Sequence, residues 1–467
     1  MICGCVRRPD DAVQSDRLPS LMPELSATTF PSNIAAPTFK IKEEGEKYYV
    51  EIGKIGEEAA IGIGSVSGEI MPDLGEWHKL LERAKGDEIY IRVYAIKENA
   101  GAVRFKDIVC EVSEHPIDPY IAYRLLYPGY VLWDRMGIYQ RNLADYTQEP
   151  ILENKDIEHQ CLNCHSFSGW SPERMMFHVR GKTGGTLIRR DGISKKVRPD
   201  IKSLGHGATY PAWHPGGRYI AFSANKVQQI FHSKGSKTTE VTDLASDMTV
   251  YDIEKDEALT APWLSGAEWM ETFPAWTPDG ETLYFCRAKG YREGMRLDSI
   301  RYDLCKVGFD PATREFGEVE TVIPASGFGK SISFPRVSPD GRWLLFTMSD
   351  YGNFSIWHPE ADLYLLDIAG GDFRPVDEVN SDNVESYHSW SSNGRWIIFS
   401  SKRGDGLWAR PYIASFDPEN GVFGSPFILP QPSPAYYNDL MQTFNIPEFI
   451  TGEVEDKEEF SRIILGS

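Results

Sequence analysis

The chain has 467 residues, with 49 basic and 68 acidic side chains and a formal net charge of −19 at pH 7. A chain this negative repels the phosphate backbone, so nucleic acid is excluded as an expected partner. The sequence contains no run of 18 apolar residues, so we expect no membrane-spanning helix, and any attachment to a membrane would come from a lipid.

The first segment, residues 1–30, resembles the end of a bacterial lipoprotein signal followed by a tether. Its Ile-Cys-Gly-Cys run fits the apolar-x-small-Cys pattern and makes Cys5 the expected site of lipidation. Pro, Ser and Asp are frequent in the residues that follow, as in a flexible linker. This predicts an extracytoplasmic protein, either periplasmic or an outer-membrane lipoprotein held by lipid alone. An ordinary disordered terminus is the alternative.

Residues 31–115 are expected to form a small β-sandwich. Stretches such as KYYVEIG and DEIYIRVYAIK alternate apolar and polar side chains, which is typical of strands with one buried face. Their number and their short turns favour immunoglobulin or fibronectin type III character. The insert GEWHKLLERAKG predicts one or two helical turns. The domain shows no chemistry of its own and is interpreted as a spacer or docking module.

Residues 116–170 are predicted to combine an aromatic strap with a haem-attachment sequence. The strap, residues 116–160, is dense in Tyr, Trp, Leu and Pro and is expected to wall the haem, with plain interdomain packing as the alternative. Cys161, Cys164 and His165 then form Cys-x-x-Cys-His, the attachment signature of a c-type haem. In that chemistry the two thiols bond to the porphyrin edge and the His binds the iron. The sequence therefore predicts one covalent haem c with His165 as the proximal ligand.

Two other interpretations of this motif remain open. A thioredoxin-like dithiol would begin a helix in a βαβ unit, and SFSGWSPERMMFH does not predict one. A structural zinc site would need a second close pair of Cys or His, and none follows. Besides Cys3, Cys5 and the two cysteines of the motif, the chain has Cys110, Cys286 and Cys305. This odd number suggests no disulfide framework.

The candidates for the distal ligand of the iron lie in RMMFHVR, shortly after the motif. His178 is the preferred candidate and Met176 the second, because alternation along a strand places both on one face. Met residues on a strand are also common core residues, and that is the alternative interpretation.

Residues 171–435 contain four repeats that predict the blades of a propeller. Each repeat has an aromatic residue, a tight turn with Gly and a buried strand, and a second pair of strands follows. One blade cannot bury both of its faces, so blades stack in a ring. The repeats are YPAWHPGGRYIAFSANK from Tyr210, FPAWTPDGETLYFCRAK from Phe273, FPRVSPDGRWLLFTMSD from Phe334 and YHSWSSNGRWIIFSSKR from Tyr387.

The aromatic-Pro-x-Trp-x-Pro-Asp-Gly pattern of these repeats resembles the TolB-type β-propeller. The hairpins in residues 174–197 predict a fifth blade, and a sixth would need strands from the segment before the haem motif or from residues 430–450. Residues 436–467 are interpreted as the C-terminal tail. The predicted fold is therefore all-β, with a TolB-like propeller of five or six blades after the β-sandwich. The order of sandwich, CLNCHSF, RMMFHVRGKTGGT and repeats also resembles a group of Bacteroidetes-type lipoproteins.

These features predict a c-type haem propeller protein of the cell envelope that works in electron transfer or redox sensing with an unidentified envelope protein. The alternative is a non-catalytic interaction scaffold with a structural or vestigial haem or thiol site. An enzyme is the least expected function, because the sequence has neither Gly-x-Ser-x-Gly nor His-Glu-x-x-His.

Overall fold

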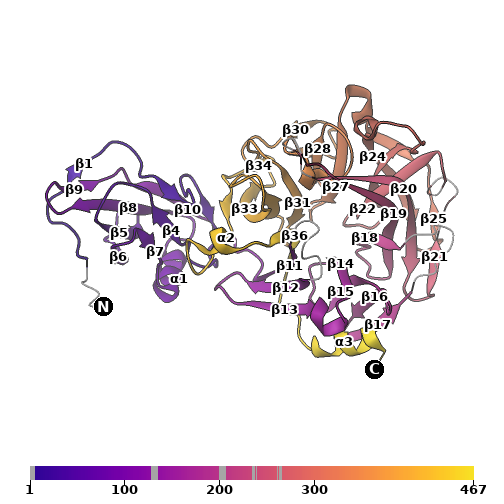
Figure 1. The fold of residues 1–467 in the computed structure, drawn as a ribbon, viewed down its shortest axis with the longest axis horizontal. Coiled ribbons are helices and arrows are strands. Elements are labelled where there is room, and N and C mark those ends of the chain that lie inside the picture. The colour runs from indigo at the N-terminus through magenta and orange to yellow at the C-terminus, as the bar shows by residue number, and fades with distance from the viewer. Residues whose placement is uncertain are drawn as a thin grey trace.

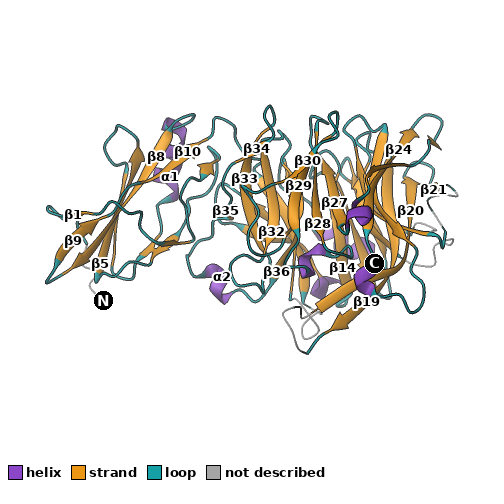
Figure 2. Cartoon of the chain, turned by 90° about the horizontal axis from the view of Figure 1, so that it is seen from above, coloured by secondary structure: helices purple, strands orange, loops and turns teal. Residues whose placement is uncertain are grey.

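The computed structural model describes residues 6–127, 135–198, 207–233, 237, 239–259, 261, 264 and 266–466. The chain is almost entirely β, with a small domain followed by a ring of sheets (Figure 1). Seen from above, the two parts lie beside each other along the long axis (Figure 2). No helix among the described residues is long and apolar enough to cross a membrane.

The front domain consists of a seven-stranded and a three-stranded sheet that share one hydrophobic core. Two of its strand pairs, β1–β9 and β3–β10, are parallel. The larger sheet contains β1 (Val13–Gln14), β3 (Thr29–Phe30), β5 (Lys47–Lys54), β6 (Ile61–Ser65), β8 (Glu88–Lys97), β9 (Gly101–Arg104) and β10 (Ile108–Val112). The smaller sheet contains β2 (Leu21–Met22), β4 (Phe39–Ile41) and β7 (Glu69–Ile70).

The helix of the front domain, α1 (Leu74–Arg83), has ten residues and is longer than the one or two turns predicted. Asp73 caps its first turn by accepting a hydrogen bond from the backbone N–H of Glu76 at 3.0 Å. Its apolar face buries Trp77, Leu80 and Leu81 against the sheets. The amphipathic spacing of these side chains explains why the helix continues through its full length.

The propeller prediction is confirmed, and the described residues form six blades. In the first five blades the first four strands of each follow chain order from the axis outward, and in the third and fifth blades a fifth strand pairs with the third strand. The first blade contains β14 (Cys161–Phe167), β15 (Arg174–Arg180), β16 (Gly185–Arg190) and β17 (Ile193–Val197), and the second contains β18 (Ala208–Trp213), β19 (Tyr219–Phe231), β20 (Thr239–Asp252) and β21 (Glu257–Leu259). The third contains β22 (Trp269–Trp276), β23 (Thr282–Lys289), β24 (Tyr302–Asp310), β25 (Glu315–Phe316) and β26 (Glu320–Ile323), and the fourth contains β27 (Ser331–Val337), β28 (Trp343–Ser349), β29 (Asp362–Asp367) and β30 (Phe373–Pro375). The fifth contains β31 (Glu385–Trp390), β32 (Trp396–Ser401), β33 (Arg410–Asp417), β34 (Val422–Phe423) and β35 (Phe427–Ile428).

The sixth blade combines strands from the two ends of the propeller. Its outer strands are β11 (Tyr120–Leu126), β12 (Met136–Asn142) and β13 (Gln148–Glu153), and its inner strand is β36 (Thr443–Ile450). The segment before the haem motif, which was expected to be a strap and was also named as a possible source of a sixth blade, supplies these outer strands. Its aromatic and aliphatic side chains are explained by burial on both faces, because each blade packs between two others.

Short helices complete the fold. After β36, α3 (Glu458–Leu465) covers the first blade, where the Phe460 ring lies 5.9 Å from the ring of Phe177. The others are η1 (Asn154–Ile157), η2 (Leu297–Ser299), η3 (Ala325–Phe328), η4 (Ser355–Trp357) and α2 (Tyr436–Asp439).

The tight turns of the four repeats have the predicted backbone. Gly217, Gly280, Gly341 and Gly394 adopt φ values of 72°, 77°, 74° and 65°. Glycine adopts this left-handed conformation without the clash that a Cβ atom causes. The turn sequences thus position each inner strand beside its neighbour in the blade.

Candidate functional site

Each of the six inner strands bends at one non-glycine residue with positive φ. At each bend the pairing with the neighbouring strand skips two residues, which is a β-bulge. We call these six residues the axial ring. They are Cys164 (43°), Tyr210 (43°), Phe273 (54°), Phe334 (51°), Tyr387 (52°) and Ile446 (48°).

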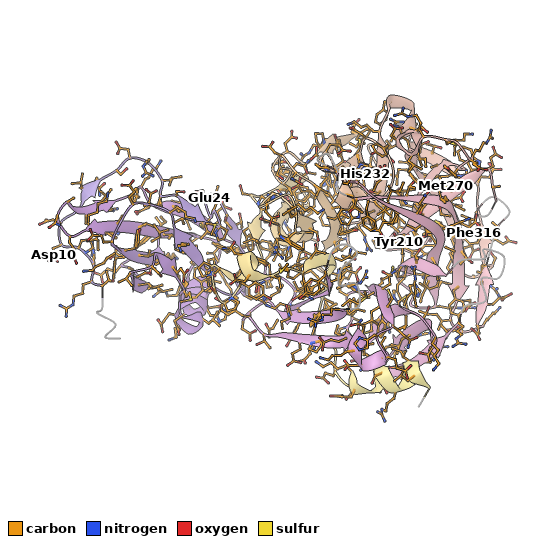
Figure 3. All side chains as sticks on the ribbon, viewed as in Figure 1. Asp10, Glu24, Tyr210, His232, Met270 and Phe316 are labelled. Carbon is orange, nitrogen blue, oxygen red and sulfur yellow. The ribbon has the colours of Figure 1, made fainter. Side chains whose placement is uncertain are left out.

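The axial ring closes the middle of the propeller. The Phe273 ring lies 4.5 Å from the ring of Tyr210 and 4.0 Å from that of Phe334. Tyr210 is seen near the centre of the blades (Figure 3). A cavity of about 20 Å³ lies beside Cys164 and His165. The aromatic residues of the sequence repeats therefore serve to fill the axis.

Cys164 and His165 occupy the place of the aromatic-Pro pair in the first blade. The residue after the ring position is Pro in four blades, namely Pro211, Pro274, Pro335 and Pro447. It is His in the other two, His165 and His388. Cys161 stands three residues earlier, at the start of β14, and is partly buried.

Burial controls the chemistry of this pair. Cys164 is 5% exposed, and burial raises the pKa of its thiol. His165 is 3% exposed, and burial, helped by the charge of Arg124, lowers its pKa to about 3. The imidazole is therefore neutral, and its Nε2 atom has no hydrogen-bond partner.

The structure does not bring the candidate distal ligands to His165. Met176 and His178 do share one face of β15, where Met176 packs between the first and second blades. The His178 ring lies 5.4 Å from that of Phe222, and its Nδ1 is 2.8 Å from Oγ1 of Thr186. Neither candidate lines the cavity beside His165. The predicted lipidation site, Cys5, lies outside the described residues.

In this arrangement the described residues do not fit a covalent haem. A pocket for a ligand of cofactor size has about 300 Å³ or more, against about 20 Å³ beside His165. Cys161 and Cys164 stand three residues apart on strand β14, and both thiols are free. No cluster of three or more His, Cys, Asp or Glu suited to a metal ion occurs in the described part of the chain.

A larger cavity of about 260 Å³ lies next to the axial ring and is lined by residues from all six blades. We call it the axial pocket. Its aromatic lining consists of Phe167, Trp170, Trp213, Trp276, Trp390 and Phe449. The side chains two residues after each ring position are Ser166, Ala212, Ala275, Arg336, Ser389 and Glu448. Four of these are small, so the Arg336 and Glu448 side chains carry the charge of the pocket.

Arg336 and Glu448 form an ion pair in the axial pocket, with Nη2 of Arg336 3.3 Å from Oε1 of Glu448. Burial raises the pKa of Glu448 to about 7, and the charge of Arg336 opposes this shift. The second carboxylate oxygen, Oε2, has no hydrogen-bond partner. The indole N–H of Trp213 also lacks one, whereas those of Trp276 and Trp390 donate to carbonyls of neighbouring blades.

Sequence reasoning missed this ion pair, although a signal was present. FPRVS carries Arg336 where two other repeats have Ala. The tail sequence FNIPEF is another copy of the inner-strand pattern, with Glu448 after the Pro. Aligning that tail with the repeats would have placed both charges on one axis.

No family model matches the chain. An uncharacterized protein of Agrobacterium fabrum is 25% identical over 202 residues, which cover 37% of this chain. The chain spans 63% of the length of that relative.

Several solved structures are similar in fold at low sequence identity. A protein assigned to TolB from Agrobacterium tumefaciens is 14% identical, covering 70% of this chain and 96% of its own, with a TM-score of 0.37. An oligogalacturonate lyase in complex with manganese is 12% identical, covering 65% of this chain and 72% of its own, with a TM-score of 0.38. Likenesses this distant transfer neither activity nor site, and the six paired sheets identify the propeller.

Proposed function

We propose that this chain is a non-catalytic binding propeller whose axial pocket holds a basic group on a segment of a partner protein. The observation that carries the proposal is the Arg336–Glu448 pair in a pocket that all six blades line. Four of the six inward positions are small, which leaves room for an incoming side chain beside the pair.

The chemistry of the lining favours a cation attached to a peptide. Oε2 of Glu448 has no hydrogen-bond partner, and a buried unpaired acceptor costs about 1–3 kcal/mol. A rotation of the carboxylate toward the pocket would pair this oxygen with an ammonium or guanidinium group. The aromatic side chains add cation–π attraction, and the unpaired indole N–H of Trp213 can donate to a peptide carbonyl.

The described lining of the pocket argues against catalysis there. It contains one carboxylate and no His, Cys or Asp side chain. A nucleophile with an adjacent base is the usual requirement for covalent catalysis, and this lining does not supply one. The amino-terminal pattern predicts that the chain and its partner protein are located in the cell envelope.

Calorimetric titration with two short amidated peptides tests the proposal. One peptide carries a central lysine, and the other carries norleucine, which has a similar length without the charge. We expect the lysine peptide to bind at least tenfold more tightly, and Glu448→Gln to abolish that preference. Glu318→Gln, which changes an exposed carboxylate on the third blade, is the matched control. Equal binding of both peptides, or an unchanged preference in the Glu448 variant, would refute the proposal.

Haem-based electron transfer is the second candidate. The Cys-x-x-Cys-His sequence supports it. The closed packing of the axial ring opposes it.

A further inference from the structure

We infer that Cys161-x-x-Cys164-His165 is the first blade's copy of the inner-strand bulge and that the folded propeller carries no covalent haem there. The inference concerns the axial ring and is independent of ligand binding in the axial pocket.

The first observation is the repeated geometry of the inner strands. In β14 the register passes from Asn163 to Ser166, and the two skipped residues are Cys164 and His165. In β22 the register passes from Thr272 to Ala275, skipping a Phe-Pro pair. The same two-residue skip occurs in every blade, always beginning at the residue with positive φ. The blade geometry therefore accounts for a residue pair here without any cofactor.

The second observation is an internal comparison offered by the fifth blade. His388 occupies the position of His165 but follows Tyr387, with no cysteine nearby in the sequence. It is 1% exposed, its Nε2 lies 2.9 Å from the carbonyl of Leu345, and its Nδ1 has no partner. Burial lowers the pKa of His388 to about 3, as it does for His165. Each of the two histidines has one unpaired ring nitrogen, Nε2 in His165 and Nδ1 in His388, so an unpaired nitrogen alone does not mark a haem ligand.

The third observation is that the two thiols lie in different surroundings. Cys161 packs against the hydrophobic cluster between the first and sixth blades. Cys164 lines the small cavity on the axis with Tyr210 and Phe273. A haem bonded to both thiols would have to reach both sites with one edge of its porphyrin. It would also have to separate the aromatic contacts that close the ring.

Haem content is the first test. The full chain is expressed with cytochrome c maturation machinery, beside a known c-type cytochrome that confirms the machinery is active. A pyridine haemochrome spectrum of the purified, denatured protein then reports covalent haem. We expect less than one-tenth of a haem per chain. A haem content near one per chain would overturn the inference.

Two variants test the positional equivalence in the same protein. His165→Pro introduces the residue found at this position in four blades, and we expect its melting temperature to stay within a few degrees of wild type. His388→Pro is the matched control in the fifth blade. Cys161→Ala/Cys164→Ala is the second variant and should also keep the wild-type melting temperature. Unfolding of the His165 variant while the His388 variant folds, or a melting temperature lowered by ten degrees or more in the double cysteine variant, would contradict the inference.

Discussion

The carboxyl group of Asp243 should make the stability of the propeller fall as the pH rises. Asp243, on β20, is fully buried where the second, third and fourth blades meet. Its Oδ2 accepts hydrogen bonds from Nδ2 of Asn225 at 2.8 Å, Nδ2 of Asn353 at 2.5 Å and the hydroxyl of Tyr302 at 3.4 Å. Oδ1 has no partner. Burial raises the pKa of this carboxyl from 3.8 to about 7.

The sign of the effect follows from proton linkage. Between pH 4 and pH 7 the folded chain holds a proton on Asp243 that the unfolded chain has released. The stabilisation is therefore complete below pH 4 and is lost as the pH rises through 7. A shift of about three pH units corresponds to about 4 kcal/mol in total. About 3 kcal/mol of this should be lost between pH 5 and pH 8.

Asp243→Asn should remove this dependence, because an amide stays neutral at every pH. Its oxygen can accept from the same donors, and its nitrogen takes the place of Oδ1. We expect the urea-derived free energy of unfolding to fall between pH 5 and pH 8 by about 3 kcal/mol less in the variant than in wild type. Asp382→Asn, at an exposed site, is the control and should follow wild type. Identical pH dependence in wild type and the Asp243 variant would refute the reasoning.

Three further predictions concern the parts that hold the fold together. Trp77→Ala should cost the front domain about 3–5 kcal/mol, because the ring is fully buried and its Nε1 donates to the carbonyl of Ile34 at 3.0 Å; a urea-derived loss below 1 kcal/mol would contradict this core position. Asp118→Ala should lower the free energy of unfolding by about 1–3 kcal/mol, because both carboxylate oxygens of Asp118 accept hydrogen bonds from Ser392. A double-mutant cycle with Ser392→Ala measures the coupling between the two residues, and additive losses would disprove it. A chain ending at Gln442 lacks β36 and α3 and should be digested rapidly by proteases, whereas resistance equal to wild type would show that the sixth blade closes without them.

The fold was predictable where local sequence determines local structure. The Pro-Asp-Gly turns and the apolar runs after them predicted four blades, because both signals lie within about 20 residues. The sequence left the count at five or six blades, because the inner strand and the outer strands of the sixth blade come from opposite ends of the propeller. The tail carries a copy of the inner-strand pattern, FNIPEF, but local periodicity does not show which distant strand it pairs with.

The candidate site was harder to predict for a different reason. Cys164 and His165 were interpreted from their chemical types, whereas their surroundings depend on a bulge that six strands share. Arg336 and Glu448 form a pair only because the ring brings the fourth and sixth blades to one axis. The alternation that placed Met176 and His178 on one face was correct, since strand geometry alone decides it.

Because the sixth blade combines strands from both ends of the propeller, the propeller can close only after β36 has paired with β11. Gln140, on β12, accepts a hydrogen bond from the backbone of Val454, 314 positions later. Until β36 arrives, β11 keeps an unpaired edge that can pair with another chain. Contacts between such distant parts form slowly, because a long loop must first be brought together. A nascent chain therefore keeps the sixth blade without its inner strand until the residues of β36 have been synthesised.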